Sequence, residues 1–342
     1  MPELQRRRGA WTQSSADAGS DKPYPARVRV VSLLPSATEL LCAIGGRDLL
    51  VGRSHECDFP ASVAALPALT AARTKGGTSG EIDRQVRETL GAGGGQSLYT
   101  LNESLLAELA PDVILTQDTC DVCSVDLATV RSCAARLKRT PQVISLDPRD
   151  IFGMFDDLLR VGEAVGRKRQ AQETMVRLRG EYWSAVDHVN PYVPAASVLV
   201  LEWTAPMFVA GHWTPGLVEA AGGKHPLNAA GARSRVVTPE EVIESMPERI
   251  IICPCGVPLH RISAELRQLE ATRWWGLLPA VAEAPAAAGL LDSRVALVDG
   301  TQMFSRPGPR LVEAFRFLVA WLQGRPELLP DAFPAMSAPV PN

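Results

Sequence analysis

Five cysteines and one histidine lie in short polar segments of a kind that binds soft metal ions. The segments are Ser54-His55-Glu56-Cys57-Asp58, Cys120-Asp121-Val122-Cys123 and Cys253-Pro254-Cys255. Thiolate and imidazole ligands favour Zn(II), Cu(I) or an iron–sulfur centre. The candidate metal ligands are therefore Cys57, Cys120, Cys123 and Cys255, which His55 could join. The alternative interpretation is that these are free cysteines in a reducing compartment.

Each of these segments follows a predicted strand. The strands are expected at residues 49–52, 113–116 and 250–252, where short apolar runs occur. Loops that leave the carboxyl ends of parallel strands gather at one edge of the sheet, so the three segments could converge. The spacing is not that of a zinc finger, and a single CxxC is a weaker metal signal than a pair of them.

Strands and helices alternate along two blocks of the sequence, which is typical of parallel α/β sheets. The longest helical pattern, residues 168–188, is polar over much of its surface and is expected to bridge the two blocks. The predicted fold class is α/β, with two Rossmann-like αβ lobes joined by a single long spanning helix. Residues 72–97, rich in glycine around a charged patch, are predicted to form a mobile surface insertion.

The domain boundaries follow from this alternation and from composition. The predicted segments are a disordered leader (1–26), an N-terminal αβ lobe (27–150), connecting helices (151–190), a C-terminal αβ lobe (195–323) and a loose Pro-rich tail (324–342).

The first turn of the N-terminal lobe has the features of a ligand-binding strand-to-helix junction. A β-branched run ends at Pro35, Ser36 is expected to cap the following helix, and Glu39 stands at the spacing of a capping box. Backbone N–H groups at such a turn point toward the sheet edge where ligands bind. Pro35, Ser36, Ala37 and Thr38 are therefore candidate ligand-binding residues. An ordinary βα junction is the alternative.

Composition excludes several classes of protein. The 342 residues are 46% hydrophobic and 21% charged, with a net charge of −3 and a pI near 6.0. A nucleic-acid-binding protein would need a basic face, and no apolar run reaches the roughly 18 residues of a membrane span. Neither a secretory signal nor a lipid anchor is evident, so the expected location is the cytoplasm, with organellar targeting left open.

The sequence carries no recognisable catalytic motif. A nucleophile elbow, a Walker loop and an HExxH segment are all absent. We therefore expect a protein that is not an enzyme.

Collinear segments from residue 27 to about residue 323 resemble the periplasmic-binding-protein family for vitamin B12 and iron–siderophores, in particular its cobalamin-binding members. The matching segments are Ser32-Leu33-Leu34-Pro35-Ser36-Ala37-Thr38-Glu39, Cys57-Asp58-Phe59-Pro60, Ala110-Pro111-Asp112-Val113-Ile114-Leu115, Ala221-Gly222-Gly223 and Ser305-Arg306-Pro307-Gly308-Pro309-Arg310. The resemblance implies two lobes joined by a spanning helix, a ligand clamped between them and little hinge motion.

The chain departs from the transporter-linked members of this family. Those members have an export signal or lipid anchor and dock on an ABC permease through one glutamate on each lobe. Glu240 stands at the matching place in the second lobe, whereas Ser104 occupies the position in the first lobe and Glu103 lies beside it. The chain therefore resembles a cytosolic branch of the family, and Glu240 is the candidate permease-docking residue.

A corrinoid ligand implies a site with aromatic faces and a few hydrogen-bond donors. The aromatic candidates after predicted strands are Phe59, Trp203, Trp213 and Phe304, with core packing as the alternative for each tryptophan. The remaining ligand-binding candidates are His55, His212 and Arg306. A neutral imidazole could ligate cobalt, although a lone histidine is more often a hydrogen-bonded loop residue.

Two functions therefore follow from the sequence. The first is a soluble protein that holds cobalamin or a similar metal chelate between two lobes. The second is a cytosolic metal- or iron–sulfur-binding sensor or redox protein that uses the cysteines on the same fold. An exported transporter-linked binding protein is a third and weaker interpretation.

Overall fold

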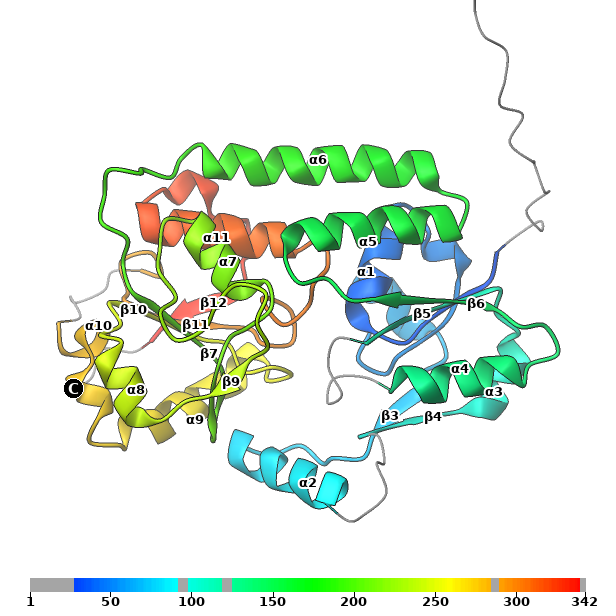
Figure 1. Ribbon diagram of the computed structural model, residues 1–342, viewed down its shortest axis with the longest axis horizontal. Helices are drawn as coiled ribbons and strands as arrows, with labels where there is room; N and C mark the ends of the chain where they lie inside the picture. The colour runs from blue at the N-terminus through cyan, green and yellow to red at the C-terminus, as the bar shows by residue number, and fades with distance from the viewer. Residues whose placement is uncertain (1–27, 92–97, 119–124, 284–288, 339–342) are drawn as a thin grey trace, which may run out of the picture.

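The computed structural model describes residues 28–91, 98–118, 125–283 and 289–338. Two α/β lobes are each built around a sheet of their own, and long helices lie along one side of both (Figure 1). The predicted two-lobed α/β architecture is therefore confirmed. The predicted leader, residues 1–26, lies outside the described part of the chain.

The N-terminal lobe contains a parallel sheet with the strand order β2-β1-β5-β6. Its strands are β1 (Val30–Ser32), β2 (Leu50–Arg53), β5 (Val113–Gln117) and β6 (Gln142–Leu146). Its helices are α1 (Pro35–Ala43), α3 (Glu103–Leu109) and α4 (Leu127–Ala135), with short 3₁₀ turns at Arg47–Leu49 and Ala61–Ala65. Because all four strands run the same way, the loops after β1, β2 and β5 leave from one edge of the sheet.

A separate arm extends from this lobe between β2 and α3. It consists of strand β3 (Thr70–Ala72), helix α2 (Ser79–Gly91) and strand β4 (Tyr99–Leu101), and β3 pairs with β4 in antiparallel fashion. Residues 72–97 within this arm were predicted to be a mobile surface insertion. In the structure α2 instead lies on the side of the molecule opposite α5 and α6, and its first residue contacts the other lobe (Figure 1).

Two antiparallel helices connect the lobes. They are α5 (Ile151–Ala164) and α6 (Lys168–Val186), and the Asp150 side chain caps α5 by accepting a hydrogen bond from the Gly153 N–H at 2.7 Å. The spanning helix was predicted over 168–188, and α6 confirms it. Its solvent side carries i,i+4 ion pairs such as Arg177 with Glu181, as expected of a helix that bridges lobes.

The C-terminal lobe contains a six-stranded sheet with the order β12-β11-β10-β7-β8-β9, parallel at its centre and antiparallel at both edges. Its strands are β7 (Val198–Thr204), β8 (Met207–Val209), β9 (Arg235–Val236), β10 (Arg249–Ile252), β11 (Val295–Val298) and β12 (Ala335–Ser337). Its helices are α7 (Thr214–Ala220), α8 (Pro239–Glu244), α9 (Leu259–Glu270), α10 (Pro279–Ala282) and α11 (Leu311–Gln323), with 3₁₀ turns at Trp275–Leu277 and Pro326–Leu328.

One continuous hydrophobic core runs through both lobes. It includes Leu40 of α1, Tyr182 of α6 and Phe315 of α11, which are all buried. The rings of Tyr182 and Phe315 lie 4.4 Å apart, centroid to centroid. The spanning helix therefore packs against the C-terminal lobe as well as against the N-terminal one. Within the described residues no helix has both the length and the apolar composition needed to cross a membrane.

Two local predictions were wrong. Ser36 does not cap α1, because the helix already begins at Pro35 and the cap position is Leu34. Residues 324–342 were predicted to be a loose tail, yet β12 in this stretch pairs with β11 and extends the sheet. The proline content concealed this strand because proline is depleted in strands and is tolerated only at sheet edges, such as the edge that β12 forms.

Asp157 in α5 gives a prediction for the pH dependence of stability. Its Oδ1 accepts a hydrogen bond from Arg160 at 2.7 Å, while its buried Oδ2 has no partner among the described residues. Burial raises the pKa of Asp157 from 3.8 to about 6, against the opposing effect of Arg160. Because the pKa is higher in the folded state, the protonated carboxyl stabilises the fold below about pH 4, and this contribution is lost as the pH rises through about 6.

We therefore expect the free energy of unfolding of Asp157→Asn to increase relative to that of the wild type as the pH rises from 4 to 7. The expected relative increase is about 2–3 kcal/mol. Urea unfolding of both proteins across this range measures the difference. A parallel pH dependence of the two free energies of unfolding would contradict the prediction.

Candidate functional site

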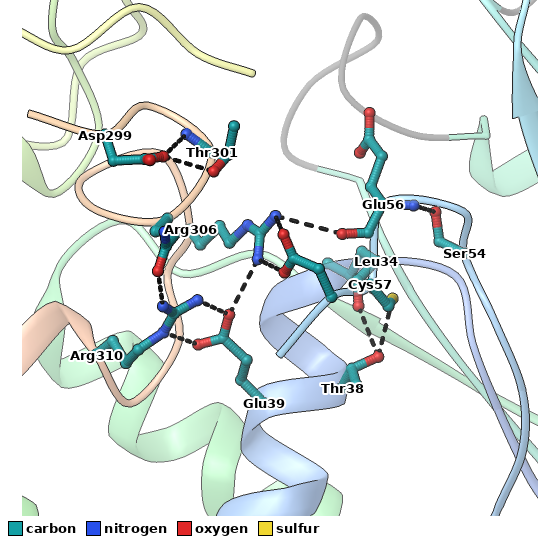
Figure 2. Close-up of polar contacts among 12 residues, drawn as sticks. Leu34, Thr38, Glu39, Ser54, Glu56, Cys57, Asp299, Thr301, Arg306 and Arg310 are labelled. Carbon is teal, nitrogen blue, oxygen red and sulfur yellow. Dashed lines mark hydrogen bonds and ion pairs between the residues drawn. The ribbon is translucent and has the colours of Figure 1, made fainter. Parts of the chain in front are cut away.

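The candidate site lies where loops of the two lobes meet. The loop after β11 in the C-terminal lobe reaches α1 and the loop after β2 in the N-terminal lobe (Figure 2). These loops follow the carboxyl ends of parallel strands, the usual place for ligands in α/β sheets. Arginines from one lobe and carboxylates from the other form the centre of this junction.

Arg310 and Glu39 join the lobes through a two-pronged ion pair. Arg310 donates from Nε to Oε2 of Glu39 at 2.9 Å and from Nη2 to Oε1 at 2.6 Å. The side chains are only 8% and 2% exposed. Two parallel N–H···O bonds are the strongest arrangement for an arginine and a carboxylate. The pair therefore ties the first helix of one lobe to the segment that begins the last long helix of the other.

Arg306 makes a second connection between the lobes. Its Nη1 donates to Asp58 Oδ1 at 2.6 Å and to Glu39 Oε1 at 3.3 Å, and its Nη2 lies 3.3 Å from the Glu56 carbonyl oxygen (Figure 2). The side chain of Arg306 is 11% exposed. The guanidinium groups of Arg306 and Arg310 are therefore both already paired with carboxylates of the N-terminal lobe.

The same loop covers the first turn of α1. A Cβ atom on Gly308 would lie 3.2 Å from Glu39 Oε2 and 3.6 Å from Ser36 Cα, so the loop rests directly on this turn. Of the predicted ligand-binding residues here, Ser36, Ala37 and Thr38 are buried and Pro35 is half-buried. The turn is thus enclosed by protein, and its part in ligand binding stays a prediction.

The loop after β2 holds Cys57 in the interior. The thiol is 1% exposed and lies 3.0 Å from the hydroxyl of Thr38, which donates to it. Burial raises the pKa of the Cys57 thiol to about 11, although the Thr38 hydrogen bond opposes this shift. The sulfur is therefore protonated near neutral pH in this arrangement, whereas a metal ligand must be a thiolate.

His55, Glu56 and Tyr99 form a polar and aromatic cluster beside this loop. Tyr99 in β4 donates its hydroxyl to Glu56 Oε1 at 3.0 Å, and its ring centroid lies 5.6 Å from that of His55. His55 Nδ1 is 2.7 Å from the hydroxyl oxygen of Thr70 in β3. Burial lowers the pKa of His55, so its imidazole is neutral at pH 7. The cluster offers a neutral nitrogen, a phenol and a carboxylate.

Phe59 is the most accessible of the predicted aromatic residues. It is 44% exposed, and the guanidinium carbon of Arg310 lies 4.1 Å from its ring centroid. This cation–π contact fixes the ring at the junction of the lobes while part of it remains open to solvent.

The predicted aromatic residues of the C-terminal lobe are more deeply placed. Trp213 and Phe304 are 8% and 5% exposed, and the Trp213 indole N–H donates to the Phe304 carbonyl oxygen at 2.6 Å. Trp203 is half-buried at the end of β7 and packs against the core of its lobe. Trp213 and Phe304 are therefore part of the hydrophobic core beneath the loops. Trp203 is the most accessible of the three residues.

His212 lies beside Trp213, with ring centroids 5.5 Å apart. Burial lowers the pKa of His212, and the nearby Arg149 and Arg233 lower it further. The imidazole is therefore neutral at pH 7. Because Arg149 belongs to the N-terminal lobe, His212 also lies near the junction between the lobes.

The predicted cysteine cluster is only partly within the described residues. Cys120 and Cys123 lie outside them, Cys57 is buried, and Cys255 is exposed at the end of β10. Its neighbour Cys253 is fully buried, with its sulfur 3.3 Å from the Met303 carbonyl oxygen. Among the described histidine, cysteine, aspartate and glutamate side chains, no group of three or more is placed to hold a metal ion. A site that includes Cys120 and Cys123 stays a prediction.

The sequence did not identify three residues of this junction as site residues: Glu39, Arg310 and Tyr99. Glu39 and Arg310 stand within recognised motifs, but their pairing joins positions 271 residues apart, and no local pattern signals it. Tyr99 stands just after the stretch 72–97 that was predicted as an insertion, and no motif includes it. Its pairing with β3 is what brings its hydroxyl to Glu56.

The candidate docking residue Glu240 is exposed in the first turn of α8. A capping box begins this helix, because Thr238 accepts from the Glu241 N–H and Glu241 accepts from the Thr238 N–H at 2.9 Å. In the N-terminal lobe, Glu103 begins α3 and pairs with Arg136. The two glutamates are thus both at helix starts, and their role in docking stays a prediction.

The sequence matches a family model described as periplasmic binding protein over residues 30–284, which is more than half of the chain. No curated protein matches the sequence.

Several solved structures share the fold. A periplasmic heme binding protein from Pseudomonas aeruginosa has a TM-score of 0.66 at 18% identity, with 90% of this chain and 96% of that chain covered. The periplasmic heme-binding protein RhuT from Roseiflexus sp. RS-1 has a TM-score of 0.64 at 19% identity, covering 87% and 99%. The periplasmic vitamin B12 binding protein BtuF of Vibrio cholerae has a TM-score of 0.61 at 17% identity, covering 87% and 98%. At these identities the likeness establishes the fold.

Proposed function

Since the chain belongs to the periplasmic binding protein family, we propose that it binds a corrinoid such as cobalamin between its two lobes. The family consists of ligand-binding proteins, so the expectation that the chain is not an enzyme is confirmed at this level. The similar structures include binders of vitamin B12 and of heme, and the chemistry of the junction must decide between such ligands.

The observation that carries the proposal is the charge balance at the junction. Arg306 and Arg310 are committed to Asp58 and Glu39, and the carboxylate of Glu56 adds negative charge nearby. Heme bears two carboxylates, which could pair with these two arginines only by displacing their present carboxylate partners. A corrin ring bears mainly neutral amides at its edge, and these need hydrogen-bond partners and no free cation.

The remaining side chains suit a broad apolar disc with an amide rim. Phe59 and Trp203 supply aromatic surface, one from each lobe. The Tyr99–Glu56 pair and the neutral His55 supply polar groups at the side of the N-terminal lobe. A mostly apolar site with a few fixed polar groups is the usual composition of a cofactor pocket.

The ultraviolet–visible spectrum of anaerobically purified protein tests this proposal, before and after hydroxocobalamin is added and the excess removed. We expect corrin bands to be retained and shifted from those of the free cofactor. Phe59→Ala should weaken retention, whereas Tyr192→Ala, at a residue 93% exposed and remote in sequence from the junction loops, should not. Loss of all corrin on gel filtration would contradict the proposal.

The same experiment addresses the cysteine-ligated alternative. Charge-transfer absorption in the untreated protein, without corrin retention, would favour a metal or iron–sulfur centre. In that case Cys120→Ser with Cys123→Ser should abolish metal retention measured by elemental analysis. Under the corrinoid proposal the same double variant should change hydroxocobalamin affinity by less than about twofold, because that proposal gives no cysteine a role in holding the ligand.

The location is a proposal as well. We propose the cytoplasm, and the five described cysteines, which are all free, support a reducing compartment. Immunodetection in fractionated cells tests this. Recovery with the membrane or outside the cytoplasm would instead favour docking on an ABC permease through Glu240.

A further inference from the structure

The arm formed by β3, α2 and β4 crosses from one lobe to the other. Its strands are attached to the N-terminal lobe, where the Leu69 N–H donates to the Arg53 carbonyl oxygen at 2.8 Å and the Asn102 N–H to the Leu69 carbonyl oxygen at 2.7 Å. Its helix α2 lies opposite the spanning helices α5 and α6, on the far side of the lobes (Figure 1). The two lobes are therefore connected on two sides, by the spanning helices and by this arm.

A buried polar tie fixes the start of α2 to the C-terminal lobe. Ser79 donates from its backbone N–H to Glu265 Oε1 at 3.1 Å and from its hydroxyl to Glu265 Oε2 at 2.7 Å. Thr204, at the end of β7, donates to the same carboxylate and lies 3.0 Å from the Ser79 hydroxyl. Ser79, Thr204 and Glu265 are 0%, 6% and 3% exposed. The buried carboxylate of Glu265 therefore accepts hydrogen bonds from α2 and from β7 in place of water.

The rest of α2 is held weakly. Its apolar residues Ile82 and Val86 are only half-buried and belong to none of the hydrophobic core clusters. One further bond crosses to the other lobe, from the Arg261 guanidinium to the Gly77 carbonyl oxygen at 2.5 Å. A segment with so little apolar burial can detach at low cost, and its attachment depends on the polar tie.

The base of the arm belongs to the candidate site. Thr70 of β3 contacts His55, and Tyr99 of β4 donates to Glu56. The tip of the arm contacts Thr204, which follows Trp203 in β7. The arm therefore extends from the polar cluster of one lobe to the aromatic residue of the other, along the side that the spanning helices leave uncovered.

We propose that helix α2, which β3 joins to the N-terminal lobe, is a strap that closes the ligand site, with Ser79, Thr204 and Glu265 as its catch. A ligand enters and leaves only when the catch is released. If the strap is closed equally often with and without ligand, association and dissociation both slow by the same factor and the affinity is unchanged. The identity of the ligand in this account rests on the proposed function.

Stopped-flow binding of hydroxocobalamin to the full chain tests the strap, with Ser79→Ala as the releasing variant. Removing a hydrogen bond to a buried carboxylate should raise both rate constants together by roughly tenfold or more, while Kd changes by less than about twofold. Thr89→Ala is the matched control, because it removes a hydroxyl from the same helix that contacts only the Gln85 carbonyl oxygen. Thr204→Val is a second releasing variant that leaves α2 unaltered.

Amide hydrogen exchange over residues 79–84, without ligand, separates the strap from the ligand proposal. We expect faster exchange there in Ser79→Ala than in the wild type and in Thr89→Ala. If neither the wild type nor any variant binds hydroxocobalamin, the proposed function fails. The exchange measurement alone then tests whether Ser79 holds α2 in place. Equal exchange in wild type and Ser79→Ala overturns the strap. A change in Kd with unchanged rate of association also overturns it, because Ser79 would then act on the bound ligand and not on access.

Discussion

Replacing Glu39 with alanine is expected to lower the free energy of unfolding by about 3–5 kcal/mol. The substitution removes the carboxylate that pairs with the buried guanidinium of Arg310. It also removes one of the carboxylate partners of Arg306. An uncompensated buried charge is among the most destabilising changes a single substitution can make. Urea or thermal unfolding of the purified variant measures the loss.

Two comparisons make this result specific. Glu103→Ala breaks an ion pair with Arg136 in which both side chains are 56% exposed, and it should cost less than about 1 kcal/mol. Replacing both buried partners, with Glu39→Leu and Arg310→Met, should recover much of the loss, because no charge is then left unpaired. A cost for Glu39→Ala as small as that for Glu103→Ala would contradict the buried pairing.

Phe315→Ala is the second substitution with a large expected effect, at about 3–5 kcal/mol. Phe315 is fully buried in α11 and packs on Tyr182 of the spanning helix. Its removal opens a cavity in the core that both lobes share, so we expect the whole chain to unfold at lower denaturant in a single transition. Circular dichroism and tryptophan fluorescence, followed together through urea unfolding, measure this.

The control is Trp183→Ala on the spanning helix α6, next to the Tyr182 ring that Phe315 contacts. Trp183 is 46% exposed, and its truncation should cost about 1 kcal/mol or less. Two separate transitions in the Phe315→Ala protein, one for each lobe, would contradict a shared core.

The sequence was sufficient for the parts of the fold that depend on periodic patterns. The alternation of strands and helices and the spanning helix α6 were predicted and are present. The position of α2 was not predictable, because α2 is attached through hydrogen bonds of Ser79 with Thr204 and Glu265. Both partners lie far from Ser79 in the sequence. The tail strand β12 was missed because a short edge strand near several prolines carries almost no local signal.

The candidate site was predictable only in its outline. Segments after strands identified Phe59, His55 and Arg306, since connectivity brings such loops to one edge. Whether an aromatic side chain faces a ligand or the core depends on neighbours that only the folded chain supplies, and Trp213 and Phe304 are in the core. The charge balance that guides the choice of ligand also needed the structure, because the partners of Arg310 and Arg306 come from the other lobe.

The most direct test of the central claim compares hydroxocobalamin and haemin as ligands of the same preparation by isothermal titration calorimetry. The paired arginines at the junction predict that the wild type binds hydroxocobalamin more tightly than haemin. Asp58→Asn removes a carboxylate partner of Arg306. It should lower the Kd for haemin and so reduce the ratio of the Kd for haemin to the Kd for hydroxocobalamin. A wild type that binds haemin more tightly than hydroxocobalamin would contradict the account.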